Sequence, residues 1–434
     1  MARRANGEGT IAKRADGRYV AAAYVFCPDG TRTRKWVYGK TRAEVADKLT
    51  EMQEKTRQGI PAVTSNMALS KYLDYWIGTV APNRYKAKTL ASYEGVVRVY
   101  LIPALGKRPL NRLTPTDIRA AMTDFRNMCL CCARGLDRKR PEARRACCSM
   151  GNCCQRNPSP RTVQYAHAVL RSALQNAVRE ELLARNVARL VETPTVPHKE
   201  VQPLTPQDAR SLLRAARQDR LYALWLLLVS TGLRRGEVLA LTWADIDLKA
   251  GQLRVRRNLQ RINGALVFGT PKTMRSLRTI ALPASCVVRL QSHQAQQVQE
   301  RAEAGMDWQP LESQPKGLVF TTLTGRPLDP RNINRSLTAL CKRAALRPVR
   351  VHDLRHTSAS LMLAEGVAVR TIMETLGHSN ISMTLDTYAH VMETTLRDAA
   401  TRMDAALSDG RDSEVGEGKK PTEQSPQAGP SGAE

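Results

Sequence analysis

Two proline-bearing stretches without hydrophobic periodicity constrain this fold more than any other feature of the sequence. The longer one, VETPTVPHKEVQP at 191–203, separates two regions whose apolar residues recur at three- and four-residue spacing. The other, around Pro61, closes a short N-terminal region. Proline-rich segments that lack periodicity mark boundaries between packed units. Because 434 residues suffice for several hydrophobic cores, we expect three folded domains.

Residues 1–60 predict a small sheet packed on one helix. Asp16-Gly17 and Pro28-Asp29-Gly30 signal turns on either side of YVAAAYVF, and a capping box from Thr41 to Glu44 opens the helix. The strands interleave basic and aromatic side chains, as in sheets that lie in a DNA groove. In the alternative interpretation, the aromatics form a miniature core and the charges are solvated. The basic residues that we assign to DNA contact are Arg18, Arg32, Arg34 and Lys35.

Beyond the first linker the pattern becomes helical. Residues 66–193 predict a helical domain, in which Thr114-Pro115-Thr116-Asp117 marks a helix start. From 200 to 405 we expect a mixed domain. Its apolar run LYALWLLLV at 221–229 is too short to span a bilayer and predicts a buried helix. LRVRRNLQ, ALVFGT and LRTIALP, between 252 and 283, predict three strands of one small sheet. Together these patterns indicate a mainly helical α+β fold with small sheets.

The charge balance indicates a polyanionic partner. Lysine and arginine number 67 against 40 acidic residues, which gives a net charge of +27. Such an excess favours nucleic acid, whose phosphates release counterions on binding, over a membrane surface or a merely soluble basic exterior. MARRANGEGT runs into polar sequence without an apolar leader, so we expect a cytoplasmic protein with no membrane partner. The tail at 408–434 holds almost no large apolar residue and should be disordered.

Histidine is concentrated in one short region, because four of the seven histidines fall between His352 and His390. This region and two earlier stretches hold four polar motifs: TGLRRGEVLAL at 231–241, TPKTMRSLRTIAL at 270–282, HDLRH at 352–356 and LGHSNISMTLDTYAHV at 376–391. In this order and spacing, the segments resemble the motifs of the tyrosine recombinases. These are the bacteriophage and mobile-element integrases that break and rejoin DNA.

The resemblance implies catalysis by Arg234, Lys272, His352, Arg355, His378 and Tyr388. Tyr388 would attack the scissile phosphate, and His352 would accept its proton or orient the group that does. The two arginine forks would clamp the non-bridging oxygens, which a lysine cannot do bidentately. His378 would donate a hydrogen bond to the phosphate, and Lys272, on a strand turn, would reach the 5′ leaving oxygen. Arg235, the rival for the first arginine position, is assigned instead to the DNA backbone or to a structural role.

The resemblance further implies a 3′-phosphotyrosyl intermediate that conserves the bond energy, so catalysis needs no metal, nucleotide or other cofactor. Its implied partners are double-stranded DNA attachment sites, further copies in a homotetramer, and accessory DNA-bending proteins of a bacterial host or phage. By patterning, residues 66–193 resemble the family's core-binding domain and residues 1–60 its arm-binding domain. Two alternatives stay open: a type IB topoisomerase-like enzyme, which the arm-like region disfavours, and a non-catalytic DNA-binding regulator, which the intact motif set disfavours.

An insertion at 127–158 departs from the family pattern. It carries seven of the ten cysteines, interspersed with arginine and lysine. Clustered cysteines with short spacings indicate a structural zinc site, although the spacing is not a clean pair of C-x-x-C motifs. Thiols that bind nothing and an iron–sulfur cluster are the alternatives. The candidate ligands are Cys129, Cys131, Cys132, Cys147, Cys148, Cys153 and Cys154.

Overall fold

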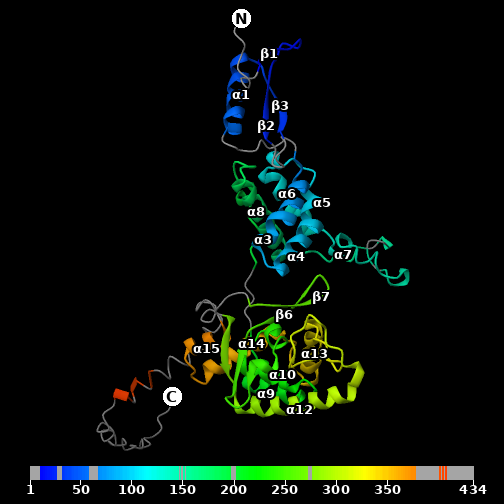
Figure 1. Ribbon diagram of the computed structural model, residues 1–434, viewed down its shortest axis with the longest axis vertical. Helices are drawn as coiled ribbons and strands as arrows, with labels where there is room; N and C mark the ends of the chain where they lie inside the picture. Colours follow the sequence, from blue (N-terminus) through cyan, green and yellow to red (C-terminus); the bar gives the residue numbers. More distant parts are fainter. Residues whose placement is uncertain are drawn as a thin grey trace, which may run out of the picture. The chain divides into compact units, whose positions relative to one another are not determined.

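The structure, a computed structural model, describes residues 10–26, 32–57, 67–145, 147, 150–151, 153–196, 202–271, 276–377, 400–401, 403–404 and 406–407. Within these residues the chain is mainly helical and carries three small sheets, which confirms the expected α+β class (Figure 1). The chain divides into two compact units, Met1–His198 and Lys199–Glu434. No helix in the described part is long and apolar enough to cross a bilayer.

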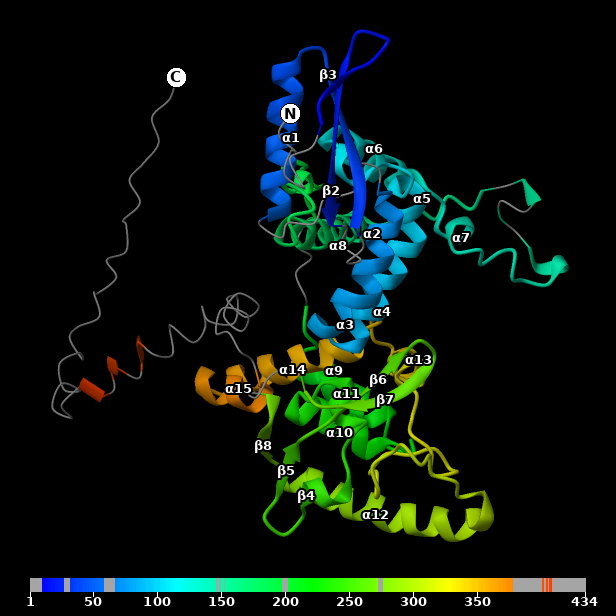
Figure 2. The same ribbon diagram turned by 45° about the horizontal axis from the view of Figure 1, so that its top comes forward.

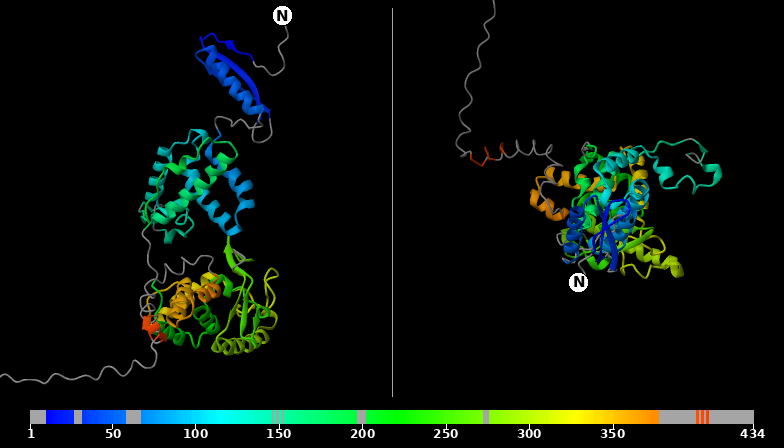
Figure 3. Two further views of the ribbon diagram at one scale, coloured as in Figure 1. Left: turned by 90° about the vertical axis from the view of Figure 1, so that its left-hand side faces the viewer. Right: turned by 90° about the horizontal axis from the view of Figure 1, so that it is seen from above.

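The first unit begins with a sheet and one helix, as predicted. Strands β1 (Ala12–Lys13), β2 (Tyr19–Phe26) and β3 (Arg32–Gly39) pair antiparallel in sequence order. Helix α1 (Arg42–Arg57) lies along one face of the sheet (Figures 2 and 3). The small residues Ala21 and Ala23 let the helix approach closely, and they pack with Val45 and Leu49 into a compact core. Thr41 Oγ1 accepts the backbone N–H of Glu44 at 3.2 Å, as the predicted capping box requires, and Glu44 Oε2 accepts the backbone N–H of Lys40 at 2.9 Å.

The same unit continues as a helical body. Its helices are α2 (Leu69–Tyr75), α3 (Ala81–Arg84), α4 (Ala87–Val96), α5 (Ile102–Leu105), α6 (Pro115–Asn127), α7 (Leu130–Ala133) and α8 (Pro160–Arg179). A π-helical turn joins α2 to α3, and another joins α4 to α5. The Tyr72 hydroxyl donates to the carbonyl of Ala173 at 2.7 Å inside the core, so α2 and α8 are tied by a buried bond. Fully buried side chains such as Trp76 and Leu170 contribute about 2 kcal/mol each.

The second unit is built around α10 (Tyr222–Thr231), whose residues 223–229 are all buried. This confirms the core helix predicted from LYALWLLLV. Helix α10 packs against α12 and α14. The unit's remaining helices are α9 (Pro206–Ala215), α11 (Arg235–Val238), α12 (Ala284–Ala304), α13 (Pro330–Arg343), α14 (Val351–Ala364) and α15 (Val369–Leu376). Its strands are β4 (Ile246–Asp247), β5 (Gln252–Val255), β6 (Asn258–Ile262), β7 (Ala265–Gly269) and β8 (Arg278–Ala281).

The prediction of one three-stranded sheet between 252 and 283 is wrong. The stretch LRVRRNLQ breaks in two, so β5 pairs with β4 and β8, while β6 forms a separate hairpin with β7. The break falls at Arg257, whose Nη2 donates to Asp245 Oδ2 at 2.5 Å and to Thr242 Oγ1 at 3.0 Å. Asp245 is buried and also accepts the backbone N–H of Thr242. A buried carboxylate therefore recruits the arginine and ends the strand. The predicted tail at 408–434 lies outside the described residues.

Candidate active site

Arg234 stands where α10 ends and α11 begins. Gly232 closes α10 with a φ of +63°, and a Cβ added there would lie 2.4 Å from Cδ2 of Leu376, so only glycine meets both demands. Two residues on, the backbone N–H and Nη1 of Arg234 donate to Glu237 at 3.0 and 2.8 Å. Its Nη2 donates to the carbonyl of Gly377 at 3.2 Å. The guanidinium is thereby held beside the C-terminal end of α15.

Arg355 reaches the same place from α14. It is 2% exposed, and its Nη1 and Nη2 donate to the carbonyls of Gly232 and Leu376 at 2.8 and 2.6 Å. The two arginines thus bind the carbonyls of consecutive residues, Leu376 and Gly377. Because a guanidinium is planar, such bonds fix its plane and direction. Two permanent positive charges therefore converge where the chain enters the LGH motif.

Glu237 is the counter-ion that the two sides of the site share. It is 3% exposed and accepts Nη2 of Arg278 at 2.9 Å in addition to the bonds from Arg234. Burial by itself raises the pKa of Glu237, but the charges of Arg278 and Arg234 outweigh it and hold the pKa below its ordinary value. Nε of Arg278 also donates to the carbonyl of Thr375 at 2.6 Å. Glu237 therefore orients both Arg234 and Arg278.

Arg278 is a contributor that the sequence reasoning missed. Its side chain is 6% exposed and joins β8 to α11 and α15 through Glu237 and Thr375. The signal was present in LRTIAL, where an arginine interrupts an apolar strand. Its partner lies 41 positions away, however, and no local spacing connects the two.

His352 and His356 share one face of α14, with ring centroids 5.1 Å apart in an edge-to-face arrangement. One side of His352 is open to solvent. On the other side, burial and then the neighbouring charges of His356 and Arg355 lower the pKa of His352 to about 4. The imidazole is therefore neutral near pH 7. Asp353 caps α14 by accepting the backbone N–H of Arg350 at 2.8 Å.

Three of the six predicted catalytic residues, Lys272, His378 and Tyr388, lie outside the described residues. Lys272 belongs to the connection between β7 and β8, and His378 directly follows Gly377 in the chain. Arg235 points to α13, where its Nη1 donates to Asn334 Oδ1 at 2.7 Å. This contact fits the structural half of the role predicted for Arg235, and its contact with DNA stays a prediction.

The predicted DNA-contact residues of the N-terminal sheet divide between its two faces. On the open face Arg34 stacks over Trp36 at 4.6 Å, beside Tyr24 and Tyr38, and these three aromatics are 45–55% exposed. Lys35 alternates to the face that α1 covers, next to Ala23 in the pairing. Arg18 pairs with Asp16 at 2.8 Å. The Arg32 side chain and the Pro28-Asp29-Gly30 turn lie outside the described part.

Among the candidate metal ligands, three come together. The sulfur atoms of Cys129, Cys147 and Cys154 all lie within 4.8 Å of one another. Cys132 lies next to this group and is disulfide-bonded. Cys148 lies outside the described residues.

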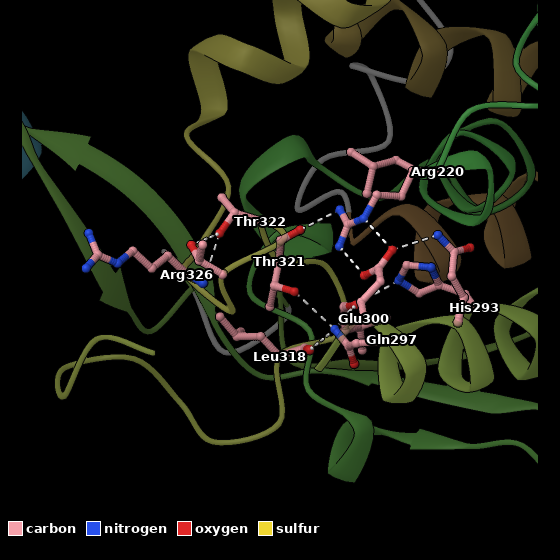
Figure 4. A network of polar contacts seen from close by, with 12 residues as sticks. Arg220, His293, Gln297, Glu300, Leu318, Thr321, Thr322 and Arg326 are labelled. Atoms are coloured by element: carbon pink, nitrogen blue, oxygen red, sulfur yellow. Dashed lines mark hydrogen bonds and ion pairs between the residues drawn. The ribbon is translucent and has the colours of Figure 1, made fainter. Parts of the chain in front are cut away.

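Histidines outside the motif region take structural roles in the described part of the chain. His293 on α12 bonds the carbonyl of Val319 at 2.9 Å through Nε2, inside the network drawn in Figure 4. In the same network Arg220 forms two bonds of 2.6 Å with Glu300 and one of 2.7 Å with the carbonyl of Thr321. His167 likewise bonds a backbone carbonyl in the helical body. These polar groups hold elements together and are distinct from the site at α14 and α15.

Comparison with known proteins finds two family profiles that match this chain. The profile of the Phage integrase family matches residues 202–395, and that of the Phage integrase, N-terminal SAM-like domain matches residues 68–125. A tyrosine recombinase XerC-like protein of Caldanaerobacter subterraneus is 28% identical over 379 residues, which cover 84% of this chain and 90% of that protein. An integrase of Streptomyces ambofaciens is 28% identical over 425 residues, covering 94% and 98%. The Tn1549 transposon integrase, solved in complex with a circular intermediate DNA, shares the fold with a TM-score of 0.57 and 20% identity, covering 78% of this chain and all of that one.

Proposed function

We infer that this chain, which belongs to the phage integrase family of tyrosine recombinases, is a site-specific recombinase that integrates or excises a mobile genetic element. The observation that carries the proposal is the convergence of Arg234 and Arg355 on the end of α15. Phosphoryl transfer places negative charge on the non-bridging oxygens, and two fixed guanidiniums are suited to bind them bidentately. The predicted nucleophile, Tyr388, follows in the motif that begins at Leu376.

We propose the following division of labour for one strand cleavage. The hydroxyl oxygen of Tyr388 attacks the scissile phosphorus and its proton passes to His352, which is neutral near pH 7 and can accept it. The bond from phosphorus to the 5′ oxygen breaks, and Lys272 donates a proton to that oxygen. His378 donates a hydrogen bond to the phosphate. The product is a 3′-phosphotyrosyl bond, and rejoining runs the same steps in reverse from a new 5′ hydroxyl.

Cationic side chains supply the charge stabilisation that this reaction needs, so no metal or nucleotide takes part in the proposed steps. The arginines act as a preformed clamp, because Glu237 and the backbone carbonyls hold both planes before DNA binds. Arg278 sustains the arrangement through Glu237. Preorganised donors of this kind contribute about 3 kcal/mol each to a transition state.

The DNA contacts are proposed to be spread over three domains: 1–60, 66–193 and 200–405. Residues 1–60 act as an arm-type domain that lays the face of Trp36 and Arg34 against DNA outside the cleavage site, since stacked guanidinium and exposed rings suit a groove. In the helical body, a depression of about 390 Å³ is lined by Arg84, Arg171, Arg179 and Arg189. Four arginines around one hollow suit phosphate contacts at the core site.

We propose that four copies assemble on two double-stranded DNA attachment sites, with accessory DNA-bending proteins where the arm domains bridge distant sites. A cytoplasmic location follows from this role. Metal, where the protein holds one, is proposed to be structural and confined to the cysteine-rich insertion.

The experiment that tests the function uses a nicked duplex that carries the element–chromosome junction. The nick lets the short cleaved strand diffuse away, so wild-type protein should accumulate as a covalent adduct on a denaturing gel. Tyr388→Phe keeps the ring and loses only the nucleophile, so it should bind the duplex normally and form no adduct. An adduct of undiminished yield with Tyr388→Phe would place the nucleophile elsewhere.

A further inference from the structure

The insertion between α6 and α8 has almost no hydrophobic core of its own. Among its described residues between 129 and 157, the buried apolar side chains are Cys131 and Cys147 alone, whereas Leu136 and Met150 are 43% and 58% exposed. The segment projects from the helices of its own unit (Figures 1 and 2). A short segment without apolar burial needs a crosslink or a bound metal to hold a single conformation.

Sulfur atoms occupy the place where a core would be. Sγ of Cys129 lies 3.7 Å from that of Cys147 and 3.5 Å from that of Cys154. A tetrahedral zinc ion with bonds of about 2.3 Å sets its sulfur ligands about 3.8 Å apart. The three thiols come from three separate stretches of the insertion. The two distances from Cys129 are close to the edge of a zinc–sulfur tetrahedron, and the sulfur atoms of Cys147 and Cys154 lie within 4.8 Å of each other.

Backbone and side-chain bonds hold these sulfurs in place. The N–H of Cys154 donates to Sγ of Cys147 at 3.3 Å, a bond that favours the thiolate form of a ligand. The N–H of Cys147 donates in turn to the buried carboxylate of Asp137 at 3.0 Å, and Asp137 pairs with Arg140 at 3.3 Å. Such outer contacts around the ligating atoms are a regular feature of metal sites.

We propose that Cys129, Cys147 and Cys154 are three ligands of a structural zinc ion, whose fourth ligand is another thiolate of the same insertion. Cys132 is the leading candidate for the fourth position. It follows Cys129 by three residues, the usual spacing of a zinc-binding pair, and its Sγ lies 3.9 Å from that of Cys147. Its disulfide must first be opened by a dithiol reductant, which is oxidised to its own disulfide as Cys132 and its partner become thiols.

Zinc would give this insertion, which is rich in basic residues, a single rigid conformation. The residues from 129 to 157 include seven arginines or lysines against two acids. Arg134 anchors the insertion to the helical body, because its Nη2 donates to the hydroxyl of Tyr100 at 2.8 Å. Fixed guanidiniums lose less conformational entropy on meeting phosphates than mobile ones do. The metal would therefore strengthen DNA binding without taking part in catalysis.

The test measures metal in the full-length protein purified with a dithiol reductant. Elemental analysis should find about one zinc per chain, and Cys129→Ser, Cys147→Ser and Cys154→Ser should each lower it roughly ten-fold. Trypsin should then cut the arginine-rich insertion at least about ten-fold faster in these variants, because without zinc the insertion no longer holds a single folded conformation. Replacing zinc by cobalt(II) in wild type should give the absorption bands of a tetrahedral thiolate site.

Two buried cysteines of the second unit, Cys286 and Cys341, provide matched controls. Cys286→Ser and Cys341→Ser should retain wild-type zinc. Cys131→Ser, Cys132→Ser, Cys148→Ser and Cys153→Ser, made singly, identify the fourth ligand by loss of the metal. Protein without zinc that gives no cobalt bands overturns the proposal, and so does iron with acid-labile sulfide in place of zinc. Zinc that survives in Cys129→Ser, Cys147→Ser and Cys154→Ser overturns it as well.

Discussion

Glu237 should be needed for fast cleavage although its side chain is buried. Its carboxylate is buried and accepts Arg278 at 2.9 Å and Arg234 at 2.8 Å. Glu237→Gln keeps the shape and one oxygen acceptor but removes the charge, which leaves the 6%-exposed Arg278 without a counter-ion. Breaking a buried pair in this way costs about 3–5 kcal/mol, and the retained oxygen places the expected loss at about 3 kcal/mol.

The effect on cleavage should be separate from the effect on stability. Without Glu237, Nη1 of Arg234 loses its bond and the guanidinium can leave the end of α15. Displacement of a catalytic group by about 1 Å lowers the rate about 100-fold. Single-turnover cleavage of the nicked duplex measures this rate, and hydrogen exchange at the amides of α10 and α14 measures local stability in the full chain.

Glu300→Gln is the matched control for this prediction. Glu300 pairs with Arg220 through two bonds of 2.6 Å in the same unit (Figure 4). This pair shares no residue with the bonds described for Arg234 and Arg278. Its loss should also cost stability, yet it should leave the cleavage rate of the folded protein within about two-fold of wild type. If both variants slow cleavage equally, or if Glu237→Gln cleaves at the wild-type rate, then Glu237 does not position Arg234.

The pH dependence of stability gives Glu237 a second signature. Its pKa is lowered in the folded state, so its contribution to stability is present above its ordinary pKa of 4.5 and disappears as the pH falls through the folded pKa. The stability difference between wild type and Glu237→Gln should therefore be constant from pH 6 to 8 and shrink in acid. A difference that grows on acidification would contradict this assignment.

Three further predictions concern the remaining groups. Lys272→Ala should slow cleavage by roughly two to four orders of magnitude. A substrate with sulfur in place of the 5′ bridging oxygen, whose thiolate leaves without a proton, should restore cleavage by Lys272→Ala but not by Arg234→Ala. If it restores neither, Lys272 is a phosphate-binding residue. Because burial and neighbouring charges lower the pKa of His352 to about 4, single-turnover cleavage should stay flat with respect to this group from pH 6 to 8 and fall only in acid, and a midpoint near 6.5 would rule His352 out as the neutral acceptor. A variant that begins near residue 62 should cleave a short core duplex yet fail in full integration, and Trp36→Ala should weaken arm-site binding; equal integration by the shortened chain would remove the arm role.

Features set by neighbouring residues were predictable from the sequence. The helix start predicted at Thr114 forms, and it is closed by a capping box in which the side chain of Thr114 accepts the N–H of Asp117 at 3.2 Å. The buried helix at 222–231 followed from its apolar run. Strand pairing between 252 and 283 did not follow, because the break at Arg257 depends on the distant carboxylate of Asp245. A sequence pattern reflects interactions between neighbouring residues, whereas the bond between Arg257 and Asp245 joins different structural elements and leaves no such pattern.

The candidate site shows the same limit. Motif spacing pointed to Arg234 and Arg355, whereas Arg278 belongs to no motif and matters only through a buried carboxylate 41 positions away. Among the seven cysteines of the insertion, spacing alone did not single out Cys129, Cys147 and Cys154. These three could be identified only from the folded insertion, in which Sγ of Cys129 lies 3.5 Å from Sγ of Cys154.

The guanidiniums that are proposed to hold the phosphate also fasten the peptide that leads to the nucleophile, since Arg234 binds the carbonyl of Gly377 and Arg355 that of Leu376. Alanine at either arginine therefore deletes two things at once, a phosphate ligand and a tether of the chain entering His378. The fold-loss in cleavage rate of the double alanine variant should then be smaller than the product of the two single fold-losses. The reason is that the first substitution already loosens the peptide that the second would also loosen. A comparison of Arg234→Ala with Arg234→Lys separates the two roles. The ammonium of lysine can restore one hydrogen bond to the carbonyl of Gly377, but it cannot bind the phosphate in the bidentate way of a guanidinium.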